Sequence, residues 1–258
     1  MLAIEIMVEG FHLRKLATCL CAVVFCAMLG GSPSPAGGVG AELSTLAPLV
    51  KRISPSVVSI TSTKRVDDSP RPVDPSEGFP DAPLARNVVG SGVILDAAIG
   101  LVVTANHVID DAETISVALA NRSCMNASVV AASPRDDLAI LRIAAPELTE
   151  ISLGDSNNVE VGDFVLAVGN PLGLGQSTTF GIVSALHRSV PGIENKDLVA
   201  TDALIDQGSS GGALINAHGE LIAVNVARLG RSDAGGFGFA VPANAIRALL
   251  ERARLGLS

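Results

Sequence analysis

The segment TDALIDQGSSGGAL, residues 201–214, contains a serine among glycines, Ser210, whose setting suits a nucleophile. Glycines beside a serine allow a sharp turn that exposes the hydroxyl and brings neighbouring backbone N–H groups toward one point, as an oxyanion hole requires. Gly-Ser-Ser-Gly-Gly is also a common composition for flexible linkers and surface loops. Because apolar runs flank the motif here, a linker is the weaker interpretation, and we take Ser210 as a candidate nucleophile.

A nucleophilic serine needs a base, and the base needs a carboxylate to orient it. Beyond the first forty residues the histidines are His107, His187 and His218. His218 lies in the turn NAHG and His187 follows the apolar run GIVSAL, positions typical of solvated loop residues. His107 ends the apolar run LVVTANHVID, so it is the candidate base, with a purely structural histidine as the alternative.

The candidate carboxylates are Asp136 and Asp137, which begin the apolar run DLAILRI. An aspartate at a strand edge is usually just a turn residue. At the start of a buried strand, however, its carboxylate loses water that an imidazole N–H can replace. No cluster of cysteines and histidines suggests a metal site, so we expect neither a metal nor an organic cofactor.

The elements that must position these residues are short strands. Apolar runs separated by glycines, in a chain with 26 glycines, no Trp and no Tyr, favour many strands over a helical bundle. We expect strands at 56–62, 88–95, 101–105, 115–120, 137–143, 164–169, 179–186, 212–215, 220–227 and 237–241. Residues 42–54 and 243–256 have helical spacing, although Pro48 would kink the first helix or start a new turn. The Pro-, Asp- and Ser-rich segment 63–87 indicates an exposed loop.

Composition excludes several classes of protein. With 48% hydrophobic and 17% charged residues, the chain is not intrinsically disordered. A formal net charge of −8 argues against a basic nucleic-acid binder.

Residues 1–41 form a predicted signal peptide and Pro/Gly/Ser linker, because Arg14 and Lys15 precede an apolar run over 16–29. Cleavage after Ala36 or Ala41 is plausible, and an uncleaved anchor is the alternative. Cys124 would then be the one cysteine left, so no intramolecular disulfide can form. We expect it to be a half-buried strand residue, with a reactive thiol as the alternative.

The blocks TANHVIDDA, DDLAILRI, VGDFVLAVGNPLGLGQSTTFGIVSAL, TDALIDQGSSGGALIN and GFGFAVP resemble successive blocks of the HtrA/DegP family of trypsin-like serine proteases. The resemblance covers about 44–250. It implies an all-β protease domain over 42–258, with two antiparallel six-stranded β-barrels at about 55–145 and 160–242. A short N-terminal helix and a C-terminal helix at 243–256 would complete it.

The resemblance also implies roles for single residues. His107 matches the general base, Asp137 the orienting acid and Ser210 the nucleophile, with Asp136 as a neighbour. The implied oxyanion hole comprises Gly208, Ser209 and Ser210, and the implied substrate-binding residues are Leu204, Asn225, Ala227 and Phe237. Leu204 stands at the base of the expected pocket, where the lack of an acid argues against Arg or Lys specificity. Phe237 would make a pocket for small or medium aliphatic side chains tighter.

The implied activity is that of a serine endopeptidase acting on unfolded or damaged envelope proteins, in the periplasm or in another exported location. Two alternatives are a processing protease with one dedicated substrate and a non-catalytic chaperone or binding module on the same fold. The family implies a homotrimer formed through 44–52, where this sequence offers Leu46 and Leu49 instead of aromatic residues. We expect no PDZ domain after the last helix, and hence no PDZ-mediated peptide partner.

Overall fold

The computed structural model describes residues 45–64, 86–170, 175–191, 193–195, 197–229 and 236–256. The predicted signal peptide and linker, and most of the predicted loop at 63–87, lie outside these residues. Contacts divide the chain into Met1–Thr45 and Leu46–Ser258, and the second unit carries nearly everything described here. Within the described residues, no helix is both long and apolar enough to cross a bilayer.

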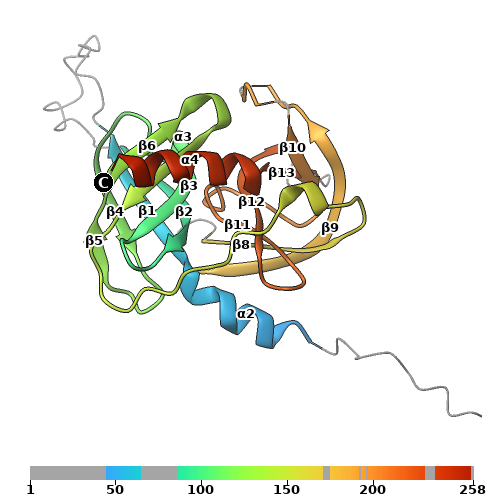
Figure 1. Ribbon diagram of the computed structural model, residues 1–258, viewed down its shortest axis with the longest axis horizontal. Coiled ribbons are helices and arrows are strands. Elements are labelled where there is room, and N and C mark those ends of the chain that lie inside the picture. Colours follow the sequence, from blue (N-terminus) through green and yellow to red (C-terminus); the bar gives the residue numbers. More distant parts are fainter. Residues whose placement is uncertain are drawn as a thin grey trace, which may run out of the picture. The chain divides into compact units, whose positions relative to one another are not determined.

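The first half of this unit is an antiparallel sheet (Figure 1). Its strands are β1 (Val57–Lys64), β2 (Arg86–Asp96), β3 (Leu101–Ala105), β4 (Ala112–Ala118), β5 (Cys124–Asn126), β6 (Ser128–Ser133) and β7 (Leu138–Arg142). They are ordered β5-β4-β1-β2-β3-β7-β6. Only Ala127 separates β5 from β6, so the two edges of the sheet are consecutive in the chain and the sheet closes into a first barrel. Counting β5 and β6 as one bent strand, this barrel has the predicted six strands.

The second half is a closed barrel with the strand order β10-β13-β12-β11-β8-β9. Its strands are β8 (Phe164–Gly169), β9 (Ser177–Arg188), β10 (Leu198–Thr201), β11 (Ala213–Asn216), β12 (Leu221–Leu229) and β13 (Phe237–Pro242). The all-β fold with two six-stranded barrels is therefore confirmed. Strands β5, β6 and β10 were not among the predicted runs.

Strand β3 is buried along its whole length. All five of its residues, Leu101–Ala105, are buried, although a strand on a barrel with one solvated face would alternate. One face of β3 fills the first barrel, and the strand also contacts β12 of the second barrel. The end of β3, where His107 follows, therefore lies at the boundary between the barrels.

Within the described residues, four helical segments accompany the sheets, besides two further single turns. These are α2 (Ala47–Ile53), α3 (Asn106–Ile109), α4 (Ala243–Leu255) and the 3₁₀ turn η2 (Pro134–Asp136), with η1 (Ser54–Ser56) and η3 (Ser156–Asn158) as the further turns. Pro48 lies in the first turn of α2, where its missing N–H costs nothing, so it starts this helix and does not kink it.

Helix α4 lies across the two barrels and packs against β6 and β7 of the first and β12 and β13 of the second (Figure 1). Arg254 forms an ion pair of 2.8 Å with Asp96, and Arg247 donates to the carbonyl of Gly154 at 2.9 Å. The side chain of Asp155 accepts from the N–H of Asn157, and this bond lowers the pKa of its carboxyl. The predicted C-terminal helix is thus present and fastens both halves.

The sequence interpretation of Cys124 was wrong in one respect. The residue does lie on a strand, β5, but it is exposed instead of half-buried. Strand β5 is a three-residue edge piece with little to pack on, which explains the exposure.

Candidate active site

His107 and Asp137 form a paired imidazole and carboxylate. Asp137 Oδ1 accepts the backbone N–H of His107 at 2.9 Å, and Asp137 Oδ2 lies 2.7 Å from His107 Nδ1. Asp137 is 8% exposed, whereas the His107 side chain is 47% exposed. Because a carboxylate accepts, the neutral imidazole carries its proton on Nδ1, which leaves Nε2 as a base facing outward.

The backbone around Asp137 fixes this pair. Asp137 follows η2 in a left-handed conformation, with φ 54° and ψ 44°, which is costly for a residue other than glycine. Its carbonyl accepts the N–H of Asn106 at 3.1 Å, and Ala105 pairs with Leu138 where β3 meets β7. Adjacent strands therefore deliver the base and the acid to one point, and the strained turn aims the carboxylate.

Ser210 comes from the second barrel and lies against the helix that carries His107. Its carbonyl accepts the N–H of Ser91 at 2.8 Å. A Cβ at Gly90 would lie 2.7 Å from the side chain of Val108 and 3.1 Å from the carbonyl of Ser210, so both groups press on one glycine. Within the described residues, no hydrogen bond joins the Ser210 hydroxyl to His107. Such bonds are often long in enzymes without substrate.

In the turn between β10 and β11, most of the backbone N–H groups already donate a hydrogen bond within the chain. Four of the six N–H groups from 207 to 212 donate within the chain: Gln207 to Asp206 Oδ1, Ser209 to Asp206 O, Gly211 to Asn225 O and Gly212 to Ser209 O. Those of Gly208 and Ser210 have no acceptor among the described residues. Gly208, with φ 92°, occupies the position of a type II turn that needs a positive φ.

This pattern bears on one predicted site residue. Ser209 is predicted to contribute to the oxyanion hole, and its N–H donates to the Asp206 carbonyl at 2.9 Å, which leaves those of Gly208 and Ser210 as the candidate donors. The turn therefore gives the N–H of Ser209 an acceptor, the Asp206 carbonyl, but gives none among the described residues to the N–H groups of Gly208 and Ser210.

Three of the four predicted substrate-binding residues have described side chains, and these differ in exposure. Leu204 is 56% exposed and Phe237 is 52% exposed, whereas Asn225 is fully buried. The side chain of Ala227 lies outside the described part of the structure. A residue that the sequence did not single out, Ile205, is buried instead and fills the space above Gly238, where a Cβ would lie 2.4 Å from Ile205 Cδ1.

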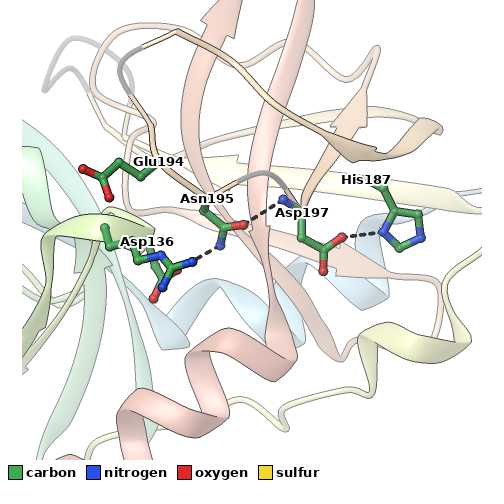
Figure 2. Close-up of a pocket in the computed structure, with 6 residues that line it drawn as sticks. Asp136, His187, Glu194, Asn195 and Asp197 are labelled. Atoms are coloured by element: carbon green, nitrogen blue, oxygen red, sulfur yellow. Dashed lines mark hydrogen bonds and ion pairs between the residues drawn. The ribbon is translucent and has the colours of Figure 1, made fainter.

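A cavity of about 560 Å³ lies beside the turn that holds Asp137, lined by Arg135, Asp136, His187, Glu194, Asn195 and Asp197. Figure 2 shows Asn195 joined to Asp136 and to Asp197, which in turn pairs with His187. The Nδ2 of Asn195 donates to Asp136 Oδ1 at 3.2 Å. His107 and Ser210 do not line this cavity, so it is separate from the paired groups above.

His218 agrees with its interpretation as a loop residue, since it is exposed in the turn before β12. His187 was expected in a loop but is the penultimate residue of strand β9, with an exposed side chain. Within the described residues, no three His, Cys, Asp or Glu side chains gather as metal ligands would.

Sequence reasoning missed two buried polar side chains at this boundary, those of Ser91 and Thr104. Ser91 donates from its hydroxyl to the Gly208 carbonyl at 2.7 Å, and Thr104 donates to the Ser91 carbonyl at 2.7 Å. Each is a hydroxyl within an apolar strand, VVGSGVIL and LVVTA, which is the signal that could have identified them.

The fold and this arrangement define a class of protein. The trypsin-like peptidase domain family matches residues 90–224, more than half of the chain. The chain belongs to the trypsin-like peptidase family.

The relatives confirm the resemblance to the HtrA/DegP group. The periplasmic serine endoprotease DegP of Salmonella typhimurium is 41% identical over 86% of this chain and 55% of its own length. The periplasmic pH-dependent serine endoprotease DegQ of Escherichia coli is 41% identical over 82% of this chain and 49% of its own length. The chain thus spans about half the length of these curated relatives.

Solved structures agree with the relatives. The HtrA-type protease AlgW with decapeptide superimposes with a TM-score of 0.68 and 36% identity, covering 82% of this chain and 68% of that one. The serine endoprotease from Yersinia pestis gives a TM-score of 0.64 and 36% identity, covering 81% of this chain and 66% of that one.

The close contact at Gly211 yields a stability prediction. A Cβ there would lie 2.1 Å from the Ser91 carbonyl, and the backbone has φ 84°. Because backbone atoms cannot move aside, we expect Gly211→Ala to lower the free energy of unfolding, measured by urea denaturation, by about 3 kcal/mol or more. Gly162→Ala is the matched control, since Gly162 has φ 103° but open space around its Cβ. The control should cost only the strain of a positive φ, about 1–2 kcal/mol. Equal costs at both glycines would show that the contact at Gly211 is not tight.

Proposed function

We propose that this chain is a serine endopeptidase that hydrolyses peptide bonds through Ser210, His107 and Asp137. One observation carries the proposal: a carboxylate holds His107 by two hydrogen bonds, one to the imidazole and one to the backbone N–H, beside a serine turn with two N–H groups that have no acceptor among the described residues. The non-catalytic alternative gives no reason for this combination, because a binding module needs neither a held tautomer nor spare amide donors.

The proposed reaction is acyl transfer to Ser210 followed by hydrolysis. As Ser210 Oγ bonds to the substrate carbonyl carbon, its proton passes to His107 Nε2, and Asp137 stabilises the imidazolium that forms. The carbonyl oxygen becomes an oxyanion, which the N–H groups of Gly208 and Ser210 bind at about 3 kcal/mol per donor. The carbon–nitrogen bond then breaks, and the leaving amine takes the proton from His107. Water repeats the sequence on the ester, which releases the acid and restores Ser210.

We propose unfolded or damaged proteins of the cell envelope as substrates and the periplasm as location. The relatives named above are periplasmic endoproteases, which supports this assignment, as does the predicted signal peptide. Ile205, buried above Gly238, supports a shallow apolar pocket for small or medium side chains.

We also propose that the chain self-associates, with a trimer expected from its family. Two aromatic rings on the surface of the second barrel support this proposal. Phe164 and Phe180 are 54% and 52% exposed, and their ring centroids lie 5.4 Å apart. Leu46 and Leu49, the residues expected to mediate contact, are instead partly buried against the core, which favours the aromatic pair.

The first test concerns the nucleophile. Ser210→Ala should abolish cleavage of an unfolded substrate such as casein, and labelling by a fluorophosphonate probe, because the acyl-accepting oxygen is gone. Ser209→Ala is the control and should still label. The Ser209 side chain is buried, so its hydroxyl is not the group that the probe is expected to label. If the wild-type and Ser210→Ala proteins behave alike and neither labels, the chain is not a serine peptidase, and the binding-module alternative takes its place.

The second test concerns the acid. Asp137→Asn should lower kcat about 10⁴-fold, because an amide in that place stabilises the wrong imidazole tautomer. Asp136→Asn is the neighbouring control, and its kcat on the same substrate should stay within about threefold of the wild-type value. Asp136 forms hydrogen bonds with Ser133 and Asn195 and not with His107. A larger loss in the Asp136 variant than in the Asp137 variant would reverse the assignment.

The third test concerns self-association. The double variant Phe164→Ser and Phe180→Ser should raise the dissociation constant of the oligomer at least tenfold, because central aromatic anchors each contribute about 2 kcal/mol. Sedimentation equilibrium measures the shift toward monomer. Val129→Ser, which removes an apolar side chain that is 47% exposed on β6, should leave the mass unchanged. A wild-type protein that is monomeric at all concentrations would contradict this part of the proposal.

A further inference from the structure

Ser91 is a fully buried residue of the first barrel that touches the serine turn of the second barrel at two points. Its hydroxyl donates to the Gly208 carbonyl at 2.7 Å, and its N–H donates to the Ser210 carbonyl at 2.8 Å. Its own carbonyl accepts the Thr104 hydroxyl at 2.7 Å. Ser91 has no part in the proton transfers above, yet it holds both residues whose N–H groups have no acceptor in the part of the chain that the structure describes.

The direction of the hydroxyl bond is fixed by its neighbours. The Ser91 oxygen also accepts the backbone N–H of Asn170 at 2.8 Å. A backbone N–H can only donate and a carbonyl can only accept, so the one hydroxyl hydrogen of Ser91 must point to Gly208. Asn170 is itself held, because its side-chain amide donates to Ser59 at 2.6 Å. The bond to Gly208 therefore has a defined polarity in a site that water does not reach.

Gly208 needs such a restraint. Without a Cβ, a glycine takes positive and negative φ with similar ease, so the sequence alone does not hold φ at 92°. The peptide group that joins Gly208 to Ser209 is held at both ends, its carbonyl by the Ser91 hydroxyl and its N–H by the Asp206 carbonyl. If the first bond were lost, rotation about the φ and ψ bonds of Gly208 would be less restrained, and its N–H, which belongs to the preceding peptide group, could change direction relative to that of Ser210.

We propose that the Ser91 hydroxyl is a positioning group for the oxyanion hole: it holds the Gly208 peptide so that the N–H groups of Gly208 and Ser210 point outward together. This inference rests on the proposed peptidase function. Ser91 acts through Gly208 and does not touch the substrate. Its loss should therefore weaken binding of the tetrahedral oxygen much more than binding of the uncharged substrate.

The test compares the full chain as wild type, Ser91→Ala and Ser91→Thr on a fluorogenic peptide amide with valine before the cleaved bond. Rates are normalised to active sites titrated with a fluorophosphonate. For Ser91→Ala we expect kcat to fall about 10- to 100-fold, because misdirecting one oxyanion donor forfeits much of its contribution, with KM within threefold. The inhibition constant of the matching peptide aldehyde, whose adduct with Ser210 carries the tetrahedral oxygen, should rise by a similar factor. Ser91→Thr keeps the hydroxyl and should retain more turnover than Ser91→Ala.

Two controls separate positioning from general damage. Ser116→Ala removes a strand serine from β4, two strands away from β2, and should leave kcat within twofold. If Ser91→Ala does not fold, Ser91→Cys, with a similar shape and a weak donor, is judged by the same criteria.

Three results would overturn the inference. The first is a kcat of Ser91→Ala within threefold of the wild-type value, and the second is a KM that rises together with the inhibition constant of the peptide aldehyde. The third is an equal loss of turnover in Ser91→Thr and Ser91→Ala. A wild-type protein that does not react with the fluorophosphonate would instead refute the proposed function.

Discussion

The hydrogen bonds that Ser91 makes with Gly208 and Ser210 join the two barrels at the point where their chemistry meets. The first barrel holds the imidazole and its carboxylate, and the second barrel holds the hydroxyl and the unused amides. Catalytic groups must stand within about 0.5 Å of their working positions, so two separately built sheets must dock in one register. The wholly buried strand β3 and the helix α4, which packs on both barrels, serve that docking.

Close docking explains why glycines surround the boundary. At Gly211, an added Cβ would collide with the Ser91 carbonyl and the Thr104 hydroxyl of the other barrel. At Gly90, it would collide with the Val108 side chain of its own barrel and lie 3.1 Å from the Ser210 carbonyl of the other. Hydrogen bonds between backbones of different sheets form only where side chains leave room for approach, so these glycines are a geometric requirement. Asp137 shows another cost of building the site. Its backbone has the left-handed conformation, which is unfavourable for a residue other than glycine, and two hydrogen bonds to His107 hold it there.

The fold class and His107 as the candidate base followed from residue type and neighbours, because apolar runs and glycine-flanked turns are local signals. The choice of Asp137 over Asp136, and of Ser210 within its motif, came from the resemblance to the HtrA/DegP family. Other features depend on contacts that no local pattern contains. Strand β6 was missed because its burial does not alternate. The use of the Ser209 N–H, which donates to Asp206, depends on the orientation of one peptide group and is not visible in the sequence. Leu204 was expected in a pocket from its spacing to Ser210, but the chain turns it to solvent and buries Ile205.

The division of the site between two barrels also bears on how the chain matures. While only one barrel has formed, the chain contains either a base without a nucleophile or a serine without a base, and neither fragment can acylate itself. The proposed reactivity therefore requires that β2 meet the serine turn. A newly made chain consequently gains the proposed ability to cut other proteins only after its own two barrels have docked.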